Sequence, residues 1–209
     1  MGRKKPDLQR RKPTRAPKRL FIIFCEGRNT EPGYFKALHR YYSGALIDVQ
    51  TIGGVGVPMT LATQAAARVE NIRNPRDSHD AGDQVWAVFD RDDHPQHEEA
   101  VMHCENNGVG VGRSNPCFEV WLLLHIEDYH KPDNRDAVQK HLNKCILEYD
   151  HKGSKTPNYA PLLNSVEEAE KRAEIQLTNR CKEGKPYGCP STTVFRLTRA
   201  IREASRTST

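Results

Sequence analysis

The sequence predicts an α/β protein with a mostly parallel sheet, helices on both faces and a helical C-terminal part. Two observations support this prediction: strand-like and helix-like patterns alternate along residues 20–90, and helical patterns dominate from about residue 133 onward. Strands that are joined through helices in this order favour a parallel sheet. The 209 residues suffice for one ordinary domain with its own core and are too few for two large ones.

The first strand is expected at residues 20–25, where six consecutive apolar residues fit a strand that is buried on both faces. Glu26 and Gly27 end this apolar run. Thr30 can then cap a helix that has Glu31 in its first turn. The apolar side chains of this helix recur at helical spacing: Tyr34, Phe35, Leu38 and Tyr41.

Residues 45–52 are rich in branched side chains and stop at Gly53, so we expect a second strand there. Residues 60–72 are rich in alanine, with apolar residues recurring on one side, and predict a helix that closes before Pro75. Residues 85–89 form another apolar run and predict the third strand. The order is therefore strand, helix, strand, helix, strand.

The remaining elements are shorter. Residues 109–112 predict a fourth strand, and the Asn-Pro pair at 115–116 breaks the chain before a helix with an apolar face. That face comprises Phe118, Trp121, Leu122 and His125. A last, basic amphipathic helix is expected at residues 191–202. We therefore expect one folded domain at residues 20–203 and a flexible tail at residues 204–209.

The basic charge of the chain is concentrated in residues 1–19, which hold nine basic residues and one acid. This arm carries +8, against +5 for the whole chain, so the other 190 residues sum to −3. Because the arm has few apolar residues, it cannot offset the entropy lost on ordering, and we expect it to be disordered when free. Such arms bind the phosphates of DNA or RNA. The candidate contacts are Arg10, Arg11, Lys12 and Arg15. A solvated tail that only adds solubility is the alternative.

The cysteines and the apolar runs bear on where the protein works. Six cysteines are scattered without a Cys-x-x-Cys pair, so the sequence does not indicate a zinc ribbon. No run approaches the roughly 18 apolar residues that span a bilayer, and the basic start lacks the apolar segment of a secretory signal. We expect a cytoplasmic protein with reduced thiols and no membrane association.

Two carboxylates, Asp90 and Asp92, follow the strand at residues 85–89. Side chains alternate along an extended chain, so both project the same way, and like-charged acids pointing together normally need a cation. Glu26 follows the first strand, and the carboxyl ends of parallel strands line one edge of a sheet. Oxygen ligands favour Mg²⁺ or Mn²⁺ over zinc. Such a cation would neutralise a phosphodiester and activate a water, with Glu26 as a further ligand or as general acid or base. Alternatively, the two aspartates begin a solvated loop.

Several further side chains are candidates for the same chemistry. Glu119 could be an additional metal ligand, and Lys155 could hold a phosphate as a point charge. His125 could approach the site from its apolar helix face, although a core histidine explains it equally well. His94 and His97 follow the aspartates, in a loop or at a helix start. The last helix has arginines at steps of three that could contact nucleic acid or an acidic partner: Arg196, Arg199 and Arg202.

These motifs together resemble the RloB family. Its members share a Cys-Glu-Gly-x-x-Thr-Glu-x-x-Tyr-Phe opening, an apolar strand ending in Phe-Asp-x-Asp, an Asn-Pro-x-Phe-Glu-x-Trp-Leu segment and a closing Pro-Ser-Thr-Thr-Val. Here they stand at residues 25–35, 89–92, 115–122 and 190–194. The resemblance implies a Toprim-like core in which Glu26, Asp90 and Asp92 bind Mg²⁺. It also implies a nuclease effector of bacterial anti-phage defence, of the restriction or abortive-infection kind, with a partner ATPase of the ABC, SMC-like or AAA class.

Two other functions remain open. In phosphatases of the haloacid-dehalogenase kind, the first aspartate of an Asp-x-Asp pair attacks phosphorus, but that pair follows the first strand of the core, whereas here it follows the third. A non-catalytic subunit could use the same acids to regulate an ATPase or to bind nucleic acid. The motifs do not distinguish DNA from RNA as the substrate.

Overall fold

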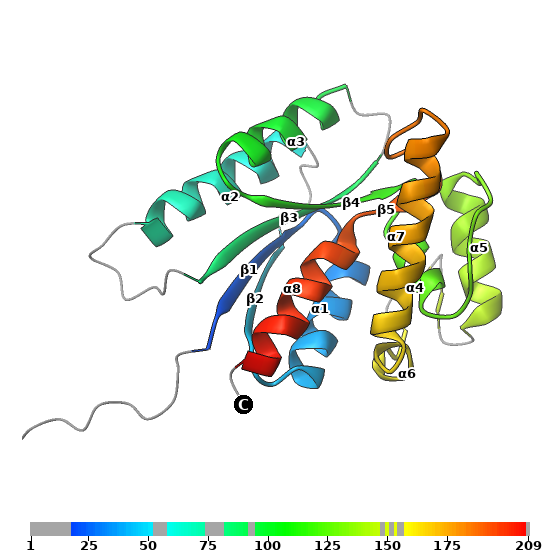
Figure 1. The fold of residues 1–209 in the computed structure, drawn as a ribbon, viewed down its shortest axis with the longest axis horizontal. Helices are drawn as coiled ribbons and strands as arrows, with labels where there is room; N and C mark the ends of the chain where they lie inside the picture. The colour runs from blue at the N-terminus through cyan, green and yellow to red at the C-terminus, as the bar shows by residue number, and fades with distance from the viewer. Residues whose placement is uncertain are drawn as a thin grey trace, which may run out of the picture.

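The computed structural model describes residues 18–51, 58–73, 82–91, 95–146, 149–150, 153 and 157–207. Within them lies a five-stranded sheet in the order β2-β1-β3-β4-β5 (Figure 1). Its strands are β1 (Leu20–Cys25), β2 (Leu46–Thr51), β3 (Gln84–Asp90), β4 (Gly110–Asn115) and β5 (Ser191–Thr192). The first four strands of the chain run parallel, and β5 adds to β4 in the antiparallel direction. The predicted α/β class with a mostly parallel sheet is confirmed, whereas the Toprim-like assignment stays a prediction.

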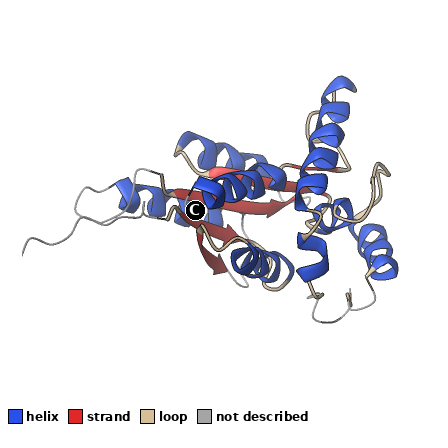
Figure 2. Ribbon diagram, turned by 60° about the horizontal axis from the view of Figure 1, so that its bottom comes forward, coloured by secondary structure: helices blue, strands red, loops and turns tan. Residues whose placement is uncertain are grey.

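Helices cover both faces of this sheet, as Figures 1 and 2 show. The helices are α1 (Thr30–Tyr41), α2 (Pro58–Arg73), α3 (His97–Asn106), α4 (Glu119–Leu124), α5 (Arg135–Cys145), α6 (Ala160–Leu163), α7 (Val166–Lys182) and α8 (Val194–Thr207). Buried side chains of α2 and α3 pack on one face, and those of α1 and α4 to α8 pack on the other. The helical C-terminal part is therefore confirmed as the larger part of one layer.

The continuous apolar run of β1 is explained by this two-sided packing. Phe21 and Ile23 point into the core shared with α1 and α4 to α8, while Ile22 and Phe24 point into the core shared with α2 and α3. Because successive side chains of a strand face opposite ways, both faces need apolar residues. A strand with apolar side chains on both faces is best buried inside the sheet, and β1 accordingly lies between β2 and β3.

Helix α4 is buried along its whole length, from Glu119 to Leu124. It begins three residues after the cis peptide bond between Asn115 and Pro116, which follows the end of β4. The apolar face predicted for this region is confirmed, and Trp121 is among the largest fully buried side chains. The helix therefore holds its first residue, Glu119, in a fixed position beside the end of β4.

The C-terminal elements differ from the prediction. The last helix starts later than expected, because residues 191–192 pair with β4 as β5, and it continues to Thr207. The predicted tail at 204–209 is therefore wrong for its first four residues. Ala204 is buried in the core, and the backbone N–H of Gly44 donates to the Ser205 hydroxyl at 3.0 Å, which anchors this turn of α8.

Some predictions concern parts of the chain outside the described residues. These are most of the basic arm, including Arg10, Arg11, Lys12 and Arg15, and the later residues Asp92, His94 and Lys155. In the described part, no helix has the length and apolar character that crossing a bilayer requires.

Candidate metal centre and active site

The structure brings Glu26 and Asp90 together at the carboxyl ends of β1 and β3. Glu26 follows β1 directly, and its backbone N–H donates to the carbonyl of Val88 at 3.3 Å. Its carboxylate Oε2 in turn accepts the backbone N–H of Asp90 at 3.3 Å. Parallel pairing of β1 with β3 causes this meeting, since Cys25 pairs with Val88 and the next residues leave the ladder at the same edge.

The Asp90 carboxylate lies between two elements from later in the chain. Its Oδ1 accepts the backbone N–H of Phe118 at 2.8 Å, just before α4. Its Oδ2 lies 3.4 Å from a guanidinium nitrogen of Arg135, the first residue of α5. The side chain keeps only 14% of its surface exposed, so the carboxylate is largely removed from water.

Glu119 lies beside this pair and is 3% exposed. Its Oε1 accepts a hydrogen bond from the hydroxyl of Tyr149 at 2.7 Å and one from the amide of Gln139 at 3.3 Å. Both donors are neutral groups, so they orient the carboxylate without cancelling its charge. Glu119 thus lines the same pocket as Asp90, and its role as a metal ligand stays a prediction.

A fourth carboxylate, Glu31, belongs to the same group. It lies in the first turn of α1, is 4% exposed, and packs against the backbone of Gly27 so closely that a Cβ atom at residue 27 would collide with its carboxylate. The pKa of Glu31 is raised from 4.5 to about 7: burial is the largest cause, the charges of Glu119 and Glu26 add to it, and hydrogen bonds from the backbone of Glu31 itself and of Gly27 act against it. Glycine at 27 is thus required for this close approach.

The same repulsion acts on Asp90. Burial raises the pKa of Asp90 well above its usual range, and Glu31, Glu119 and Glu26 raise it too, while Arg135 lowers it. Three of these acids, Glu31, Asp90 and Glu119, line a pocket of about 150 Å³ together with Gly27, Arg28, Asn29, Thr30, Phe118, Arg135 and Gln139. The ionised forms of Glu31 and Asp90 are therefore disfavoured in the absence of a cation.

The donor set fits a hard dication. All four groups offer carboxylate oxygens, the ligands of Mg²⁺ and Mn²⁺, and a cation would favour their ionised forms. No three of these four described carboxylates offer oxygen atoms that all lie within 4.8 Å of one another. Such an open arrangement suits Mg²⁺, which usually keeps several of its own waters.

A model of the family described as RloB-like protein matches residues 21–201. The chain belongs to the RloB-like family. No curated protein and no solved structure matches it.

Three sequence motifs that suggested this RloB-like membership meet at the pocket. Residues 25–35 contribute Gly27 and Glu31 as well as Glu26, residues 89–92 contribute Asp90, and residues 115–122 contribute Glu119. Segments far apart in the RloB-like sequence thus supply one group of acids.

Two of the candidate histidines, His125 and His97, are buried in the core and do not line the carboxylate pocket. His125 is buried, with Nδ1 2.8 Å from the carbonyl of Leu162 and Nε2 3.2 Å from the hydroxyl of Tyr34. Burial lowers its pKa to about 4, so it is a neutral core histidine. His97 is also buried, with its ring against Phe89 on the face covered by α2 and α3.

The arginines predicted to form a basic face on the last helix mostly pair within the RloB-like fold. Arg199 contacts Glu174 at 2.9 Å and Arg202 contacts Glu170 at 2.7 Å, both acids being on α7. These ion pairs join α7 to α8, so the two arginines act first as intramolecular partners.

Sequence reasoning missed four residues of the site: Glu31, Arg135, Gln139 and Tyr149. A signal existed for Glu31, because it follows Glu26 by five positions within one motif, but an acid in the first turn of a helix is common for another reason. Arg135 and Gln139 are one helical turn apart on α5, and nothing in their sequence surroundings indicates that α5 reaches β3.

Proposed function

We propose that this RloB-like protein is a metal-dependent nuclease that cleaves phosphodiester bonds of DNA or RNA with Mg²⁺, or Mn²⁺ in its place. One observation supports this most: four carboxylates gather at the carboxyl ends of β1 and β3 around a pocket, and the pKa values of Glu31 and Asp90 are raised. Buried carboxylates that lie close together destabilise the folded state when they are ionised, unless a bound cation neutralises them.

In this proposal Asp90 and Glu26 hold the cation directly, Glu119 binds it through one of its waters, and Asp92, in the segment after β3, is a further ligand. When bound, the cation neutralises the phosphodiester and lowers the pKa of an attacking water. Tyr149 and Gln139 keep Glu119 directed into the pocket. Arg135, next to Asp90, can bind a phosphate oxygen of the substrate.

Proton transfer falls to Glu26 or Glu31. A group that gains and loses a proton near neutral pH is the more effective acid or base. The pKa of about 7 favours Glu31 for this role, and its contact with Gly27 keeps it at the pocket wall.

The cellular role in this proposal rests on the family. We propose a cytoplasmic effector of antiviral defence that works with an ATPase of the ABC, SMC-like or AAA class on a Toprim-like core. The basic arm, with Arg10, Arg11, Lys12 and Arg15, and the loop residue Lys155 would hold the nucleic-acid backbone.

The direct test is incubation of the purified full-length protein with plasmid DNA and, separately, with total RNA, in Mg²⁺, in Mn²⁺ and in EDTA. We expect cleavage of at least one substrate that requires the metal. Intact substrates in every metal would contradict the nuclease proposal. Binding without cleavage would indicate a regulatory subunit, and a phosphorylated Asp90 would indicate a phosphatase.

Deletion of residues 1–17 is expected to weaken nucleic-acid binding and to flatten its dependence on salt. Each DNA phosphate that the arm neutralises adds about 0.9 to the slope of log affinity against log salt, so the slope falls by that amount for each phosphate the shortened protein leaves free. Lys18 and Arg19 stay, because the carbonyl of Arg19 accepts the backbone N–H of Leu46 next to β1. The measurement is fluorescence anisotropy with a labelled oligonucleotide over a salt series.

The matched control is a full-length variant that keeps the length of the arm but replaces four of its basic residues by glutamine: Arg10, Arg11, Lys12 and Arg15. It should reproduce most of the flattening. An unchanged slope in both variants would exclude the arm as the binding element.

A further inference from the structure

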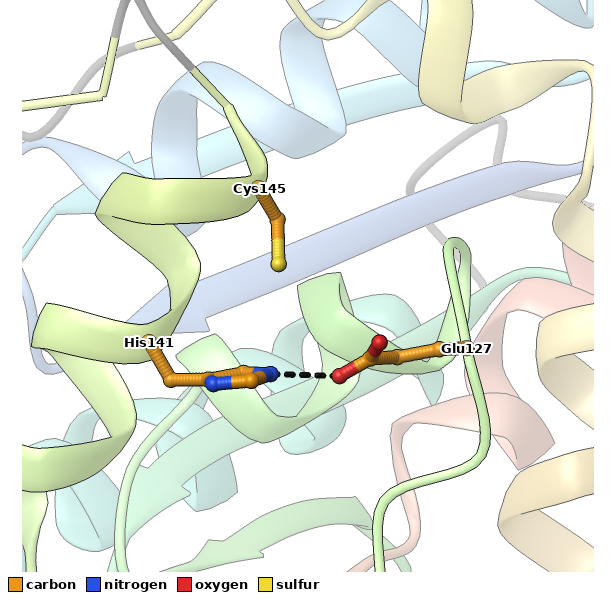
Figure 3. A group of neighbouring side chains, drawn as sticks. All are labelled: Glu127, His141 and Cys145. Carbon is orange, nitrogen blue, oxygen red and sulfur yellow. Dashed lines mark hydrogen bonds and ion pairs between the residues drawn. The ribbon is translucent and has the colours of Figure 1, made fainter.

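A second group of ligating side chains lies apart from the carboxylate pocket. It comprises Glu127, in the turn after α4, and His141 and Cys145 on α5 (Figure 3). One ligand atom from each lies within 4.8 Å of the other two. Figure 3 shows the sulfur, the imidazole and the carboxylate directed toward one common space.

Local structure accounts for this arrangement. His141 and Cys145 are four residues apart, so they lie on the same face of α5, one above the other. The backbone N–H of Glu127 donates to the carbonyl of Leu123 at 2.9 Å, which holds the turn in place. His141 Nε2 meets Glu127 Oε1 at 2.5 Å, and the ring of Tyr129 packs beside the imidazole.

We propose that Glu127, His141 and Cys145 form a zinc-binding site, with a water as the fourth ligand. A nitrogen, a sulfur and an oxygen are the ligands of zinc, and they distinguish this site from the oxygen-only pocket that suits Mg²⁺. Tetrahedral zinc would hold such atoms roughly 3.3–3.8 Å apart. The three atoms already lie within 4.8 Å of one another, and zinc binding would move His141 Nε2 and Glu127 Oε1 apart from their present 2.5 Å.

Exposure and charge at the cluster are consistent with metal entry. The side chains of His141 and Glu127 are 40% and 42% exposed, and Cys145 is exposed, so an ion can reach all three from water. Partial burial raises the pKa of the Cys145 thiol, and the carboxylate of Glu127 raises it further. A bound cation removes this repulsion between the two groups.

Zinc at this position would tie α5 to the turn after α4. Helix α5 also supplies Arg135 and Gln139, which contact Asp90 and Glu119. The site would therefore have a structural role, by fixing the helix that supports the carboxylate pocket. The inference does not depend on whether that pocket cleaves nucleic acid.

Cobalt is the sharpest probe, because a thiolate bound to Co²⁺ gives a charge-transfer absorption in the near ultraviolet that oxygen ligands do not give. We expect full-length, metal-stripped protein in excess Mg²⁺ to develop this band on stoichiometric addition of Co²⁺, and Zn²⁺ to remove it. Cys145→Ser should abolish the band. Cys181→Ser, which changes another exposed cysteine, and Asp90→Asn should keep it.

Zinc binding is measured in parallel by elemental analysis and by competition with a chromophoric chelator. We expect Cys145→Ser and His141→Ala to lower zinc affinity by at least about tenfold. Zinc should raise the melting temperature of the wild type and of Cys181→Ser, but not that of Cys145→Ser or His141→Ala. Circular dichroism without metal checks that the variants fold. The absence of a cobalt band in the wild type, or equal zinc protection of Cys145→Ser, would overturn the proposal.

Discussion

Replacement of Asp90 by Asn is expected to reduce metal-dependent cleavage of nucleic acid by about 10²–10³-fold, on the scale of losing a group that stabilises transition-state charge. Asparagine keeps an oxygen that can accept the N–H of Phe118, now 2.8 Å from Oδ1, so the local backbone has no reason to move. It removes the negative charge that a cation needs. It also removes one charge from a crowded group, so the metal-free fold should be at least as stable as the wild type.

The experiment compares initial cleavage rates of wild type and Asp90→Asn over a range of Mg²⁺ concentrations. Asp48→Asn, an exposed aspartate on β2, is the matched control and should cleave at the wild-type rate. Isothermal titration with Mg²⁺ separates lost metal binding from lost chemistry. A folded Asp90→Asn protein with wild-type activity would remove the main support for the nuclease proposal.

Glu31→Gln is expected to stabilise the metal-free protein at pH above about 7 and to remove much of the dependence of its stability on pH. The pKa of Glu31 rises from 4.5 to about 7 on folding, so the folded chain binds more protons than the unfolded chain between these values. Stability therefore falls as the pH rises through this window. One pKa unit corresponds to about 1.4 kcal/mol, so the gain for the variant at high pH is on the order of 3 kcal/mol.

The measurement is urea unfolding in EDTA at pH about 5 and about 8, the two sides of the window. We expect the wild type to be less stable at the higher pH and Mg²⁺ to restore part of the loss there, because the ion neutralises the acids. The pKa of Asp90 is also raised, so the stability of Glu31→Gln still falls with rising pH, but less steeply than that of the wild type. Glu99→Gln, on the exposed side of α3, should behave as the wild type. A variant that is less stable than the wild type at both pH values would contradict this account of Glu31.

These two variants separate two roles within one site. Asp90 has contacts from α4 and α5, which makes it the acid around which the pocket is built. Glu31 contacts the backbone at Gly27 and has a pKa raised to about 7. If cleavage depends on a proton moved by Glu31, Glu31→Gln also lowers the rate while leaving Mg²⁺ affinity closer to the wild-type value than Asp90→Asn does.

Local sequence pattern was enough to predict the parallel α/β sheet and the meeting of Glu26 with Asp90. Apolar runs mark strands that are buried on both faces, and parallel strands end at the same edge of a sheet. The sequence motifs also predicted the RloB family, and the family match over residues 21–201 confirmed this membership. Glu119 was predicted from the sequence only as a candidate for an additional metal ligand beside that pair.

The surroundings of those acids depend on tertiary packing. Glu31 looked like an ordinary first-turn acid, and only the close approach of α1 to Gly27 turned it into a buried carboxyl with a raised pKa. His125 had the spacing to reach the site, but its hydrogen bond to Leu162 made it a core residue. The packing of α5 brings Arg135 to Asp90 and His141 to Glu127. Contacts between residues distant in sequence depend on how helices dock, which periodicity does not encode.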